Sequence, residues 1–251
     1  MSETLIHVDQ LRTYLATADT TVKAVDDISF TINKGETYCL VGESGSGKSI
    51  TALSIMRLLP KGISSHPSGE IIFNSQHNNE SINILDVKDE DMLNIRGSRI
   101  AMIFQEPMNS LNPVYTIGEQ IIETLQIHWP EMSNEQARQK AIKALADVQI
   151  KDPDHRIDEY PHRLSGGQRQ RVMIAMAMAC EPELLIADEP TTALDVTVQA
   201  EILKLMQDLQ KQNNMSILFI THDFGVVAQI AHKLAVMKQG EICLLYTSDA
   251  A

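Results

Sequence analysis

Short runs of apolar residues alternate along the chain with stretches of helical periodicity. The runs are too short for helices and lack the polar alternation of half-buried strands, so they predict strands that are buried on both faces. They lie at residues 38–41, 100–104, 184–187, 216–221 and 234–237. This alternation predicts an α/β fold with a parallel sheet that is covered by helices.

Apolar residues recur at helical spacing in residues 135–148 and again in residues 198–209. A third stretch, residues 172–179, is apolar nearly all round and predicts a buried helix. Residues 4–32 look instead like strands and turns. The polar segment 74–91 is expected to be loop-rich and to lie at the surface.

Composition narrows the function classes. The 251 residues carry a net charge of -12, which argues against a protein that grips nucleic acid by its charge. The three cysteines show neither metal-ligand nor paired spacing, which favours a reducing compartment. The chain has no apolar run near the roughly 20 residues that span a bilayer and no secretory signal at its start. We therefore expect a cytoplasmic protein that reaches a membrane only through a partner.

The first chemical motif follows the first buried run. It fits G-x-x-x-x-G-K-[ST] and consists of Gly42, Glu43, Ser44, Gly45, Ser46, Gly47, Lys48 and Ser49. Glycines let backbone N–H groups approach phosphates, a lysine meets the β- and γ-phosphates, and the last hydroxyl reaches Mg²⁺. A chance glycine-rich turn is the alternative. The position between a predicted strand and a predicted helix favours a phosphate-binding loop, with Lys48 and Ser49 in these roles.

Two carboxylates, Asp188 and Glu189, follow the buried run 184–187. Asp188 is suited to the Mg²⁺ shell, directly or through water. Glu189 is suited to orient the attacking water or accept its proton. Such a pair alone is also typical of a solvated loop or a helix cap. Together with the phosphate-binding loop, it predicts nucleotide hydrolysis.

A second glycine-rich segment precedes the predicted buried helix. It consists of Ser165, Gly166, Gly167 and Gln168. Ser165 could simply cap the helix. Two adjacent glycines at a helix start nevertheless suggest that a ligand approaches the backbone, and a phosphate fits this position.

Taken together, these motifs resemble the ABC ATPase family, whose Walker A, Q-loop, LSGGQ, Walker B, D-loop and H-loop motifs occur here in family order. Gln105 matches the Q-loop, residues 193–195 (Ala-Leu-Asp) the D-loop, and His222 the H-loop. Tyr14 stands where the family carries an aromatic residue that stacks on adenine, although it could equally be an ordinary strand residue. The resemblance covers residues 1–242.

The resemblance implies a P-loop NTPase (RecA-like) core with a parallel sheet, an N-terminal antiparallel β subdomain and an inserted α-helical subdomain at about 106–165. It implies ATP and Mg²⁺ as cofactors. Glu189 and His222 would be catalytic, and Ser49, Gln105 and Asp188 would hold Mg²⁺. ATP would be contacted by Tyr14, residues 42–49, Ile50, Gln105, Asp188, Ser165 to Gln168 and Asp195.

Within this family the chain looks most like the ATPase subunits of dipeptide, oligopeptide and glutathione importers. The segments VGESGSGKS, MIFQEPMNSLNP, YPHRLSGGQRQRVMIAMAMA, IADEPTTALDVTVQAEIL and FITHD carry this likeness. It implies a bacterial protein on the cytoplasmic face of the inner membrane. Its partners would be a second ABC ATPase subunit, identical or not, transmembrane permease subunits and, indirectly, a periplasmic or lipid-anchored solute-binding protein, with no nucleic acid.

Other interpretations use the same motifs. Nickel importers share much of the pattern, and another solute transporter or an exporter is a further alternative. A soluble ABC protein of translation or DNA repair would be expected to show a basic face, zinc cysteines or a long coiled coil, which this sequence lacks. A catalytically silent nucleotide sensor is disfavoured because every catalytic position is filled.

The sequence departs from the family after Ile242. Residues 243–251 read CLLYTSDAA, where relatives continue with further strand and helix. This string resembles the translation of a transposase adapter used in preparing sequencing libraries. We therefore expect residues 243–251 to be an artefact that makes few specific contacts and no contact with the site.

Overall fold

The computed structural model describes residues 3–75, 80–105, 110–192 and 194–247. Residues 106–109 beside Gln105, Ala193 of the expected D-loop, part of segment 74–91 and the last four residues lie outside this part. The chain forms two compact units. Unit 1 comprises Met1–Met92 and Asn214–Ala251, and unit 2 comprises Leu93–Asn213.

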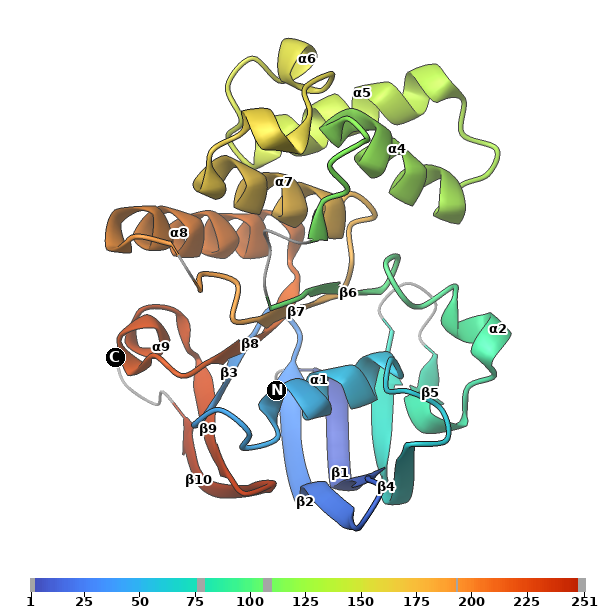
Figure 1. Ribbon diagram of the computed structural model, residues 1–251, viewed down its shortest axis with the longest axis vertical. Coiled ribbons are helices and arrows are strands. Elements are labelled where there is room, and N and C mark those ends of the chain that lie inside the picture. The colour runs from blue at the N-terminus through green and yellow to red at the C-terminus, as the bar shows by residue number, and fades with distance from the viewer. Residues whose placement is uncertain (1–2, 76–79, 106–109, 193, 248–251) are drawn as a thin grey trace. The chain divides into compact units, whose positions relative to one another are not determined.

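Unit 1 contains an antiparallel sheet with the strand order β2-β1-β4-β5 (Figure 1). Its strands are β1 (Thr4–Ala16), β2 (Thr21–Asn33), β4 (Ser64–Asn74) and β5 (Ser81–Asn83). Ile28, Phe30 and Ile32 alternate with more exposed residues along β2, so one face of this strand is buried. The expected antiparallel β subdomain is thereby confirmed.

The second group of strands in unit 1 is ordered β10-β9-β3-β8. Its members are β3 (Thr37–Val41), β8 (Ser216–Thr221), β9 (Lys233–Lys238) and β10 (Glu241–Thr247). β3 pairs in parallel with both β8 and β9. Every residue of β3 and β8 is buried, as the unbroken apolar runs predict. α1 (Lys48–Met56) lies against β1 and β2, and α9 (Phe224–Ile230) lies against β3 and β8.

Segment 74–91 is more structured than the sequence predicts. Besides β5 it contains a 3₁₀ turn, η1 (Ile84–Asp86), and it leads into α2 (Asp89–Met92). The side chain of Asn83 caps η1 by accepting a hydrogen bond from the N–H of Leu85. Ile84 and Met92 are fully buried. Most described residues of the segment are exposed or half-buried, as expected, and only the expectation that it is loop-rich is wrong.

The expectation that residues 243–251 make few specific contacts is wrong for residues 243–247. These residues belong to β10, which pairs with β9 from Glu241↔Lys238 to Thr247↔Lys233. The side chains of Leu244, Leu245 and Tyr246 are nevertheless more than half exposed. Backbone groups form the ladder, and an edge strand accepts almost any extended partner. The pairing therefore does not test where these residues come from, and their origin stays a prediction.

The described part of unit 2 combines two strands with helices (Figure 1). β6 (Ile100–Ile103) and β7 (Leu184–Asp188) pair in parallel. The helices are α4 (Ile117–His128), α5 (Asn134–Asp147), α6 (Pro153–Arg156), α7 (Gly166–Met178) and α8 (Val196–Asn213), with a 3₁₀ turn, η2 (Pro161–Arg163). α7 contacts α4, α5, α8 and β6, which explains why its second half, residues 172–178, is apolar nearly all round.

The helical subdomain expected at about 106–165 includes α4, α5 and α6, and its boundaries stay a prediction. α4 and α5 both begin with capping boxes, Thr116 with Glu119 and Ser133 with Gln136. No helix in the described ranges combines the length and the apolar character needed to cross a bilayer.

Candidate functional site

The glycine-rich loop of residues 42–49 connects β3 to α1 in unit 1. Two of its glycines are required by their surroundings. A Cβ on Gly42 would lie 2.3 Å from the carbonyl oxygen of Met237, and a Cβ on Gly47 would lie 2.4 Å from that of Ala24. Gly47 also has a φ of 106°, which L side chains rarely adopt. The loop is therefore pressed against the backbone of neighbouring strands.

Lys48 folds back over this loop. Its side chain is buried, and its Nζ donates hydrogen bonds to the carbonyl oxygens of Gly42 (2.7 Å) and Glu43 (2.9 Å). α1 begins at Lys48 with no side-chain cap and no acidic residue in its first turn, which also holds Ser49 and Ile50. Backbone N–H groups, a positive helix end and an ammonium group thus converge, and this combination attracts phosphate.

The hydroxyl of Ser46 adds a further polar group to the loop. Its Oγ is buried without a hydrogen-bond partner among the residues that the structure describes. An unsatisfied buried hydroxyl is costly, and a bound polar ligand can remove that cost. The loop therefore fits the triphosphate that the sequence predicts.

His222 follows β8 at the same sheet edge as this loop. β3 and β8 are parallel with Val41 opposite Thr221, so Gly42 and His222 leave the sheet together. The turn after His222 is held by two bonds. The Asp223 N–H donates to Thr221 Oγ1 at 3.0 Å, and the Gly225 N–H donates to Asp223 Oδ1 at 2.7 Å. His222 is exposed at this edge.

Tyr14 lies in β1, half-buried, opposite Lys23 of β2. Its hydroxyl donates a hydrogen bond to Asp26 Oδ1 at 3.1 Å. The Nζ of Lys23 lies 5.5 Å from the centre of the Tyr14 ring. The next residue, Ala24, supplies the carbonyl that abuts Gly47. Tyr14 is therefore on the strand pair that borders the phosphate-binding loop.

Gln105 and Glu189 meet in unit 2. The parallel pairing of Ile103 with Ala187 places the residues that follow β6 and β7 side by side. The Gln105 Nε2 donates to Glu189 Oε2 at 3.2 Å. Asp188, the last residue of β7, is buried. The structure thus brings together three of the residues that the sequence assigns to Mg²⁺ and water.

Sequence reasoning missed Thr192. Its Oγ1 donates a hydrogen bond to the same Glu189 Oε2 at 3.1 Å. Glu189 has a φ of 48°, and this left-handed turn brings the residue three positions later back toward its carboxylate. A hydroxyl three positions after a carboxylate is too common in sequences to be a signal by itself.

The segment Ser165–Gln168 forms a capping box at the start of α7. Ser165 Oγ accepts from the Gln168 N–H at 3.3 Å, and Gln168 Oε1 accepts from the Ser165 N–H at 2.9 Å. A Cβ on Gly167 would lie 2.8 Å from Cγ1 of Val198, whereas Gly166 has nothing nearer than 3.9 Å. The Val198 side chain of the same chain thus explains why residue 167 is a glycine. That a ligand approaches the backbone stays a prediction, and it now concerns Gly166.

Asp195 caps α8. Its Oδ1 accepts hydrogen bonds from the N–H groups of Thr197 (3.1 Å) and Val198 (3.0 Å). Because Val198 also lies against Gly167, the start of α8 is attached to the start of α7. The predicted role of Asp195 in contacting ATP is additional to this local role.

The predicted site residues fall into two sets. Unit 1 holds Tyr14, residues 42–50 and His222. Unit 2 holds Gln105, Ser165 to Gln168, Asp188, Glu189 and Asp195. Within the described ranges, no three His, Cys, Asp or Glu side chains are grouped in a way that could hold a metal ion.

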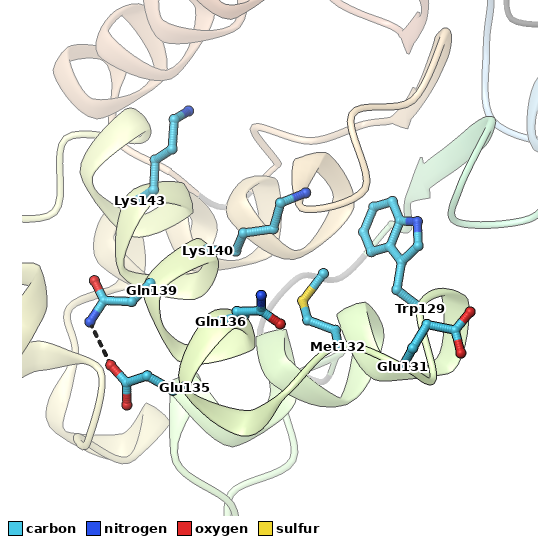
Figure 2. Close-up of a pocket in the computed structure, with 8 residues that line it drawn as sticks. All are labelled: Trp129, Glu131, Met132, Glu135, Gln136, Gln139, Lys140 and Lys143. Atoms are coloured by element: carbon cyan, nitrogen blue, oxygen red, sulfur yellow. Dashed lines mark hydrogen bonds between the residues drawn. The ribbon is translucent and has the colours of Figure 1, made fainter.

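A cavity of about 690 Å³ lies in unit 2, beside α5 and the segment before it (Figure 2). Its lining includes Trp129, Met132 and Lys140, and the Lys140 Nζ points at the Trp129 ring, 4.4 Å from its centre. None of the eight residues that line it belongs to the predicted site. The cavity is therefore separate from the motif residues.

Comparisons with known proteins agree with the motifs. The family described as "ABC transporter" matches residues 25–192. The chain is 49% identical over 241 residues to the "Probable peptide ABC transporter ATP-binding protein y4tR" of Sinorhizobium fredii, covering 96% of this chain and 70% of that protein. It is 52% identical over 246 residues to the "Oligopeptide transport ATP-binding protein AppD" of Bacillus subtilis, covering 98% and 73%.

Solved structures are similar as well. One is a dimeric, post-hydrolysis state of the ATP-binding cassette MJ0796 bound to ADP and Pi, with a TM-score of 0.83 and 27% identity. The match covers 98% of this chain and 100% of that one. The expected P-loop NTPase architecture is thereby confirmed.

Proposed function

This chain belongs to the ABC transporter family, and we propose that it is the ATP-hydrolysing subunit of a bacterial peptide importer. The observation that carries the proposal is the start of α1. There the buried Lys48 folds over a glycine-rich loop, and the N-cap residue Gly47 has no side chain to cap the helix. Such an end offers its N–H groups and positive dipole to a triphosphate.

Ser49, Gln105 and Asp188 would hold Mg²⁺ together with phosphate oxygens, because Mg²⁺ prefers oxygen ligands and is commonly shared between one or two carboxylates and a nucleotide. When bound, the ion neutralises charge on the phosphates as it develops. Ile50 and the N–H groups of residues 42–49 would complete the phosphate contacts, and Tyr14 would stack on adenine.

Glu189 would accept a proton from the attacking water. As the water oxygen bonds to the γ-phosphorus, the bond to the bridging β–γ oxygen breaks and ADP leaves. Gln105 and Thr192 both donate to Oε2 of Glu189, which orients the carboxylate. His222 leaves the sheet at the same edge as the phosphate-binding loop and would donate to the γ-phosphate.

Two such subunits would face head to tail, with Ser165 to Gln168 and Asp195 of one chain meeting the nucleotide on the other. The dimeric state of MJ0796 bound to ADP and Pi supports the pairing of two subunits. The second helix end would add N–H donors to the γ-phosphate. The pairing then depends on ATP and weakens on hydrolysis.

Peptides are the proposed cargo because relatives at 46–52% identity are described as peptide, oligopeptide and dipeptide transport ATP-binding proteins. Permease subunits would carry the transmembrane path, and a periplasmic or lipid-anchored binding protein would choose the peptide. The chain would work at the cytoplasmic face of the inner membrane and bind no nucleic acid.

Glu189→Gln tests the hydrolytic role. The substitution keeps the size of the side chain but removes its basicity, so ATP still binds while turnover falls by about 100-fold or more. Glu135→Gln, on the exposed face of α5, is the matched control and keeps the wild-type rate. Steady-state phosphate release measures both. A Glu189→Gln rate within a factor of two of wild type would refute the role.

Mixing two inactive variants tests whether residues of two chains together form each nucleotide site. Ser165→Arg disables the segment that acts on the partner, and Lys48→Ala disables the nucleotide loop of its own chain. A mixed dimer then retains one intact site, and phosphate release recovers in the mixture. If mixed dimers form, as shown by pull-down of two different tags, and no activity returns, the head-to-tail arrangement is wrong.

A further inference from the structure

A two-residue turn in unit 1 connects the phosphate-binding loop to the strand pair that carries Tyr14. It consists of Gln239 and Gly240, between β9 and β10, with φ values of 52° and 87°. Two positive φ values in succession are typical of a type I′ hairpin turn. The Gly240 N–H donates to the carbonyl oxygen of Ser46 at 3.0 Å, and the Gly240 carbonyl accepts from the Asp26 N–H at 2.8 Å. The turn thus bonds to the loop on one side and to β2 on the other.

The carbonyl of Ala24 lies between two glycines. It is 2.4 Å from the position of a Cβ on Gly47 and 3.2 Å from that of a Cβ on Gly240. Neither glycine could be replaced without moving this part of β2. The phosphate-binding loop, the turn and β2 are therefore held in contact through backbone atoms alone.

Asp26 connects this backbone contact to the Tyr14 ring. Its Oδ1 accepts from the Tyr14 hydroxyl at 3.1 Å, and its Oδ2 accepts from the Lys23 Nζ at 2.9 Å. The Arg12 Nε lies 3.4 Å from Oδ1. The bond from Lys23 is the main cause that lowers the pKa of the Asp26 carboxyl, with Tyr14 and Arg12 acting in the same direction. The carboxylate therefore stays ionised at neutral pH and keeps accepting from the ring.

We propose that Asp26 is a positioning residue for nucleotide recognition. Its backbone is bonded to the phosphate-binding loop through Gly240, and its carboxylate holds Tyr14, so it sets the place of the adenine platform relative to the phosphates. A ring held in one orientation loses less freedom when a base stacks on it. Asp26 thereby favours ligands that carry a base over ligands that consist of phosphates alone. This inference rests on the proposed function, in which Tyr14 stacks on adenine.

The test compares the binding of Mg-ATP with that of magnesium triphosphate by calorimetry on the full chain. Asp26→Ala is expected to raise the Kd for ATP roughly three- to tenfold, since the Tyr14 ring must then be immobilised on binding. The Kd for triphosphate stays within a factor of two. Tyr14→Phe keeps the ring and loses only its hydroxyl, so it should match Asp26→Ala. The double variant should be no weaker than the weaker single one.

Asp27→Asn is the matched control. Asp27 pairs with Arg12 at 3.1 Å, and asparagine tolerates its φ of 61°. It should leave both Kd values unchanged. Equal weakening of ATP and triphosphate, unchanged ATP binding, or additive single effects would overturn the role of Asp26. If Asp26→Ala fails to fold, Tyr14→Phe decides instead, by the same comparison of the Kd for ATP with the Kd for triphosphate. A wild-type chain that binds no ATP would instead refute the proposed function itself.

Discussion

Two helices of this chain begin after glycines or with them, and their first turns differ. α1 starts after Gly47, which has a φ of 106° and provides no side-chain cap. α7 starts after Ser165, which has a φ of -66° and forms a reciprocal capping box with Gln168. Both segments suggest phosphate binding in the sequence. The first has no side-chain cap, whereas the second satisfies two of its N–H groups with its own side chains and has fewer left for a ligand.

The reasons for the glycines differ in the same way. A Cβ added to Gly42 or Gly47 would lie 2.3 or 2.4 Å from a backbone carbonyl oxygen. A backbone oxygen, unlike the end of a flexible side chain, cannot move aside without disturbing its strand. Gly167 faces the Val198 side chain, and Gly166 faces nothing nearer than 3.9 Å. The comparison favours the proposal that the start of α1 binds a nucleotide within one chain. The exposed start of α7 is suited to a ligand that another chain brings.

The largest effect is expected at Lys48. Lys48→Ala removes the buried ammonium group from the phosphate-binding loop, and ATP hydrolysis should fall about 100-fold or more. The exposed Lys151→Ala is a control that should keep the wild-type rate. Phosphate release measures both. A Lys48→Ala variant with the wild-type rate and ATP affinity would show that the loop is not the nucleotide site.

The next largest effect is expected when a glycine at one of the two helix starts is replaced by alanine. Gly47→Ala forces a Cβ against the Ala24 carbonyl at a positive φ, and the free energy of unfolding should drop by about 3 kcal/mol. Gly166→Ala has room and should change it by less than about 1 kcal/mol. Chemical denaturation measures the difference between the two variants. Equal losses at the two positions would remove the steric distinction between α1 and α7.

A smaller effect is expected at Ser165. Ser165→Ala removes the oxygen that accepts from the Gln168 N–H, and loss of such a cap costs about 1 kcal/mol. ATP binding by the single chain should stay unchanged, because the loop of residues 42–49 is intact. Chemical denaturation measures the loss in the free energy of unfolding. Calorimetry at low protein concentration measures the Kd for ATP. Weaker ATP binding by the monomer would mean that α7 contacts the nucleotide of its own chain.

The smallest expected effect is a difference between the two units in the rate of thiol labelling. Burial raises the pKa of Cys39 in unit 1 to about 12 and that of Cys180 in unit 2 to about 11, so both thiols stay protonated at pH 8. Cys243 is exposed and should label first. Gly47→Ala should speed labelling of Cys39, and Ser165→Ala that of Cys180, as read by mass spectrometry. Equal acceleration at both sites would show that the units open together.

Local patterns predict much of this fold. Each of the five apolar runs became a strand, and β3, β7 and β8 are buried on both faces as predicted, whereas β9 alternates between buried and half-buried residues. The stripe expected in residues 135–148 was less accurate. Leu145 and Val148 of the expected stripe are buried, but Ile142 is only half-buried, and the small residues Ala137 and Ala141 are buried as well. Small residues carry little weight in a hydrophobic pattern, although they allow helices to pack closely.

The sequence alone indicated the glycine-rich loop, the adjacent carboxylates Asp188 and Glu189 and the family, since each motif depends on residues that are neighbours in the chain. Only the tertiary structure decided that Val41 lies opposite Thr221, that Thr192 and Gln105 share one oxygen of Glu189, and that Gly240 connects Ser46 to Asp26. These contacts depend on strand register and on turns with positive φ, which bring together residues far apart in the chain. A pattern of neighbouring residues does not encode that register, because shifting two strands leaves each local pattern unchanged.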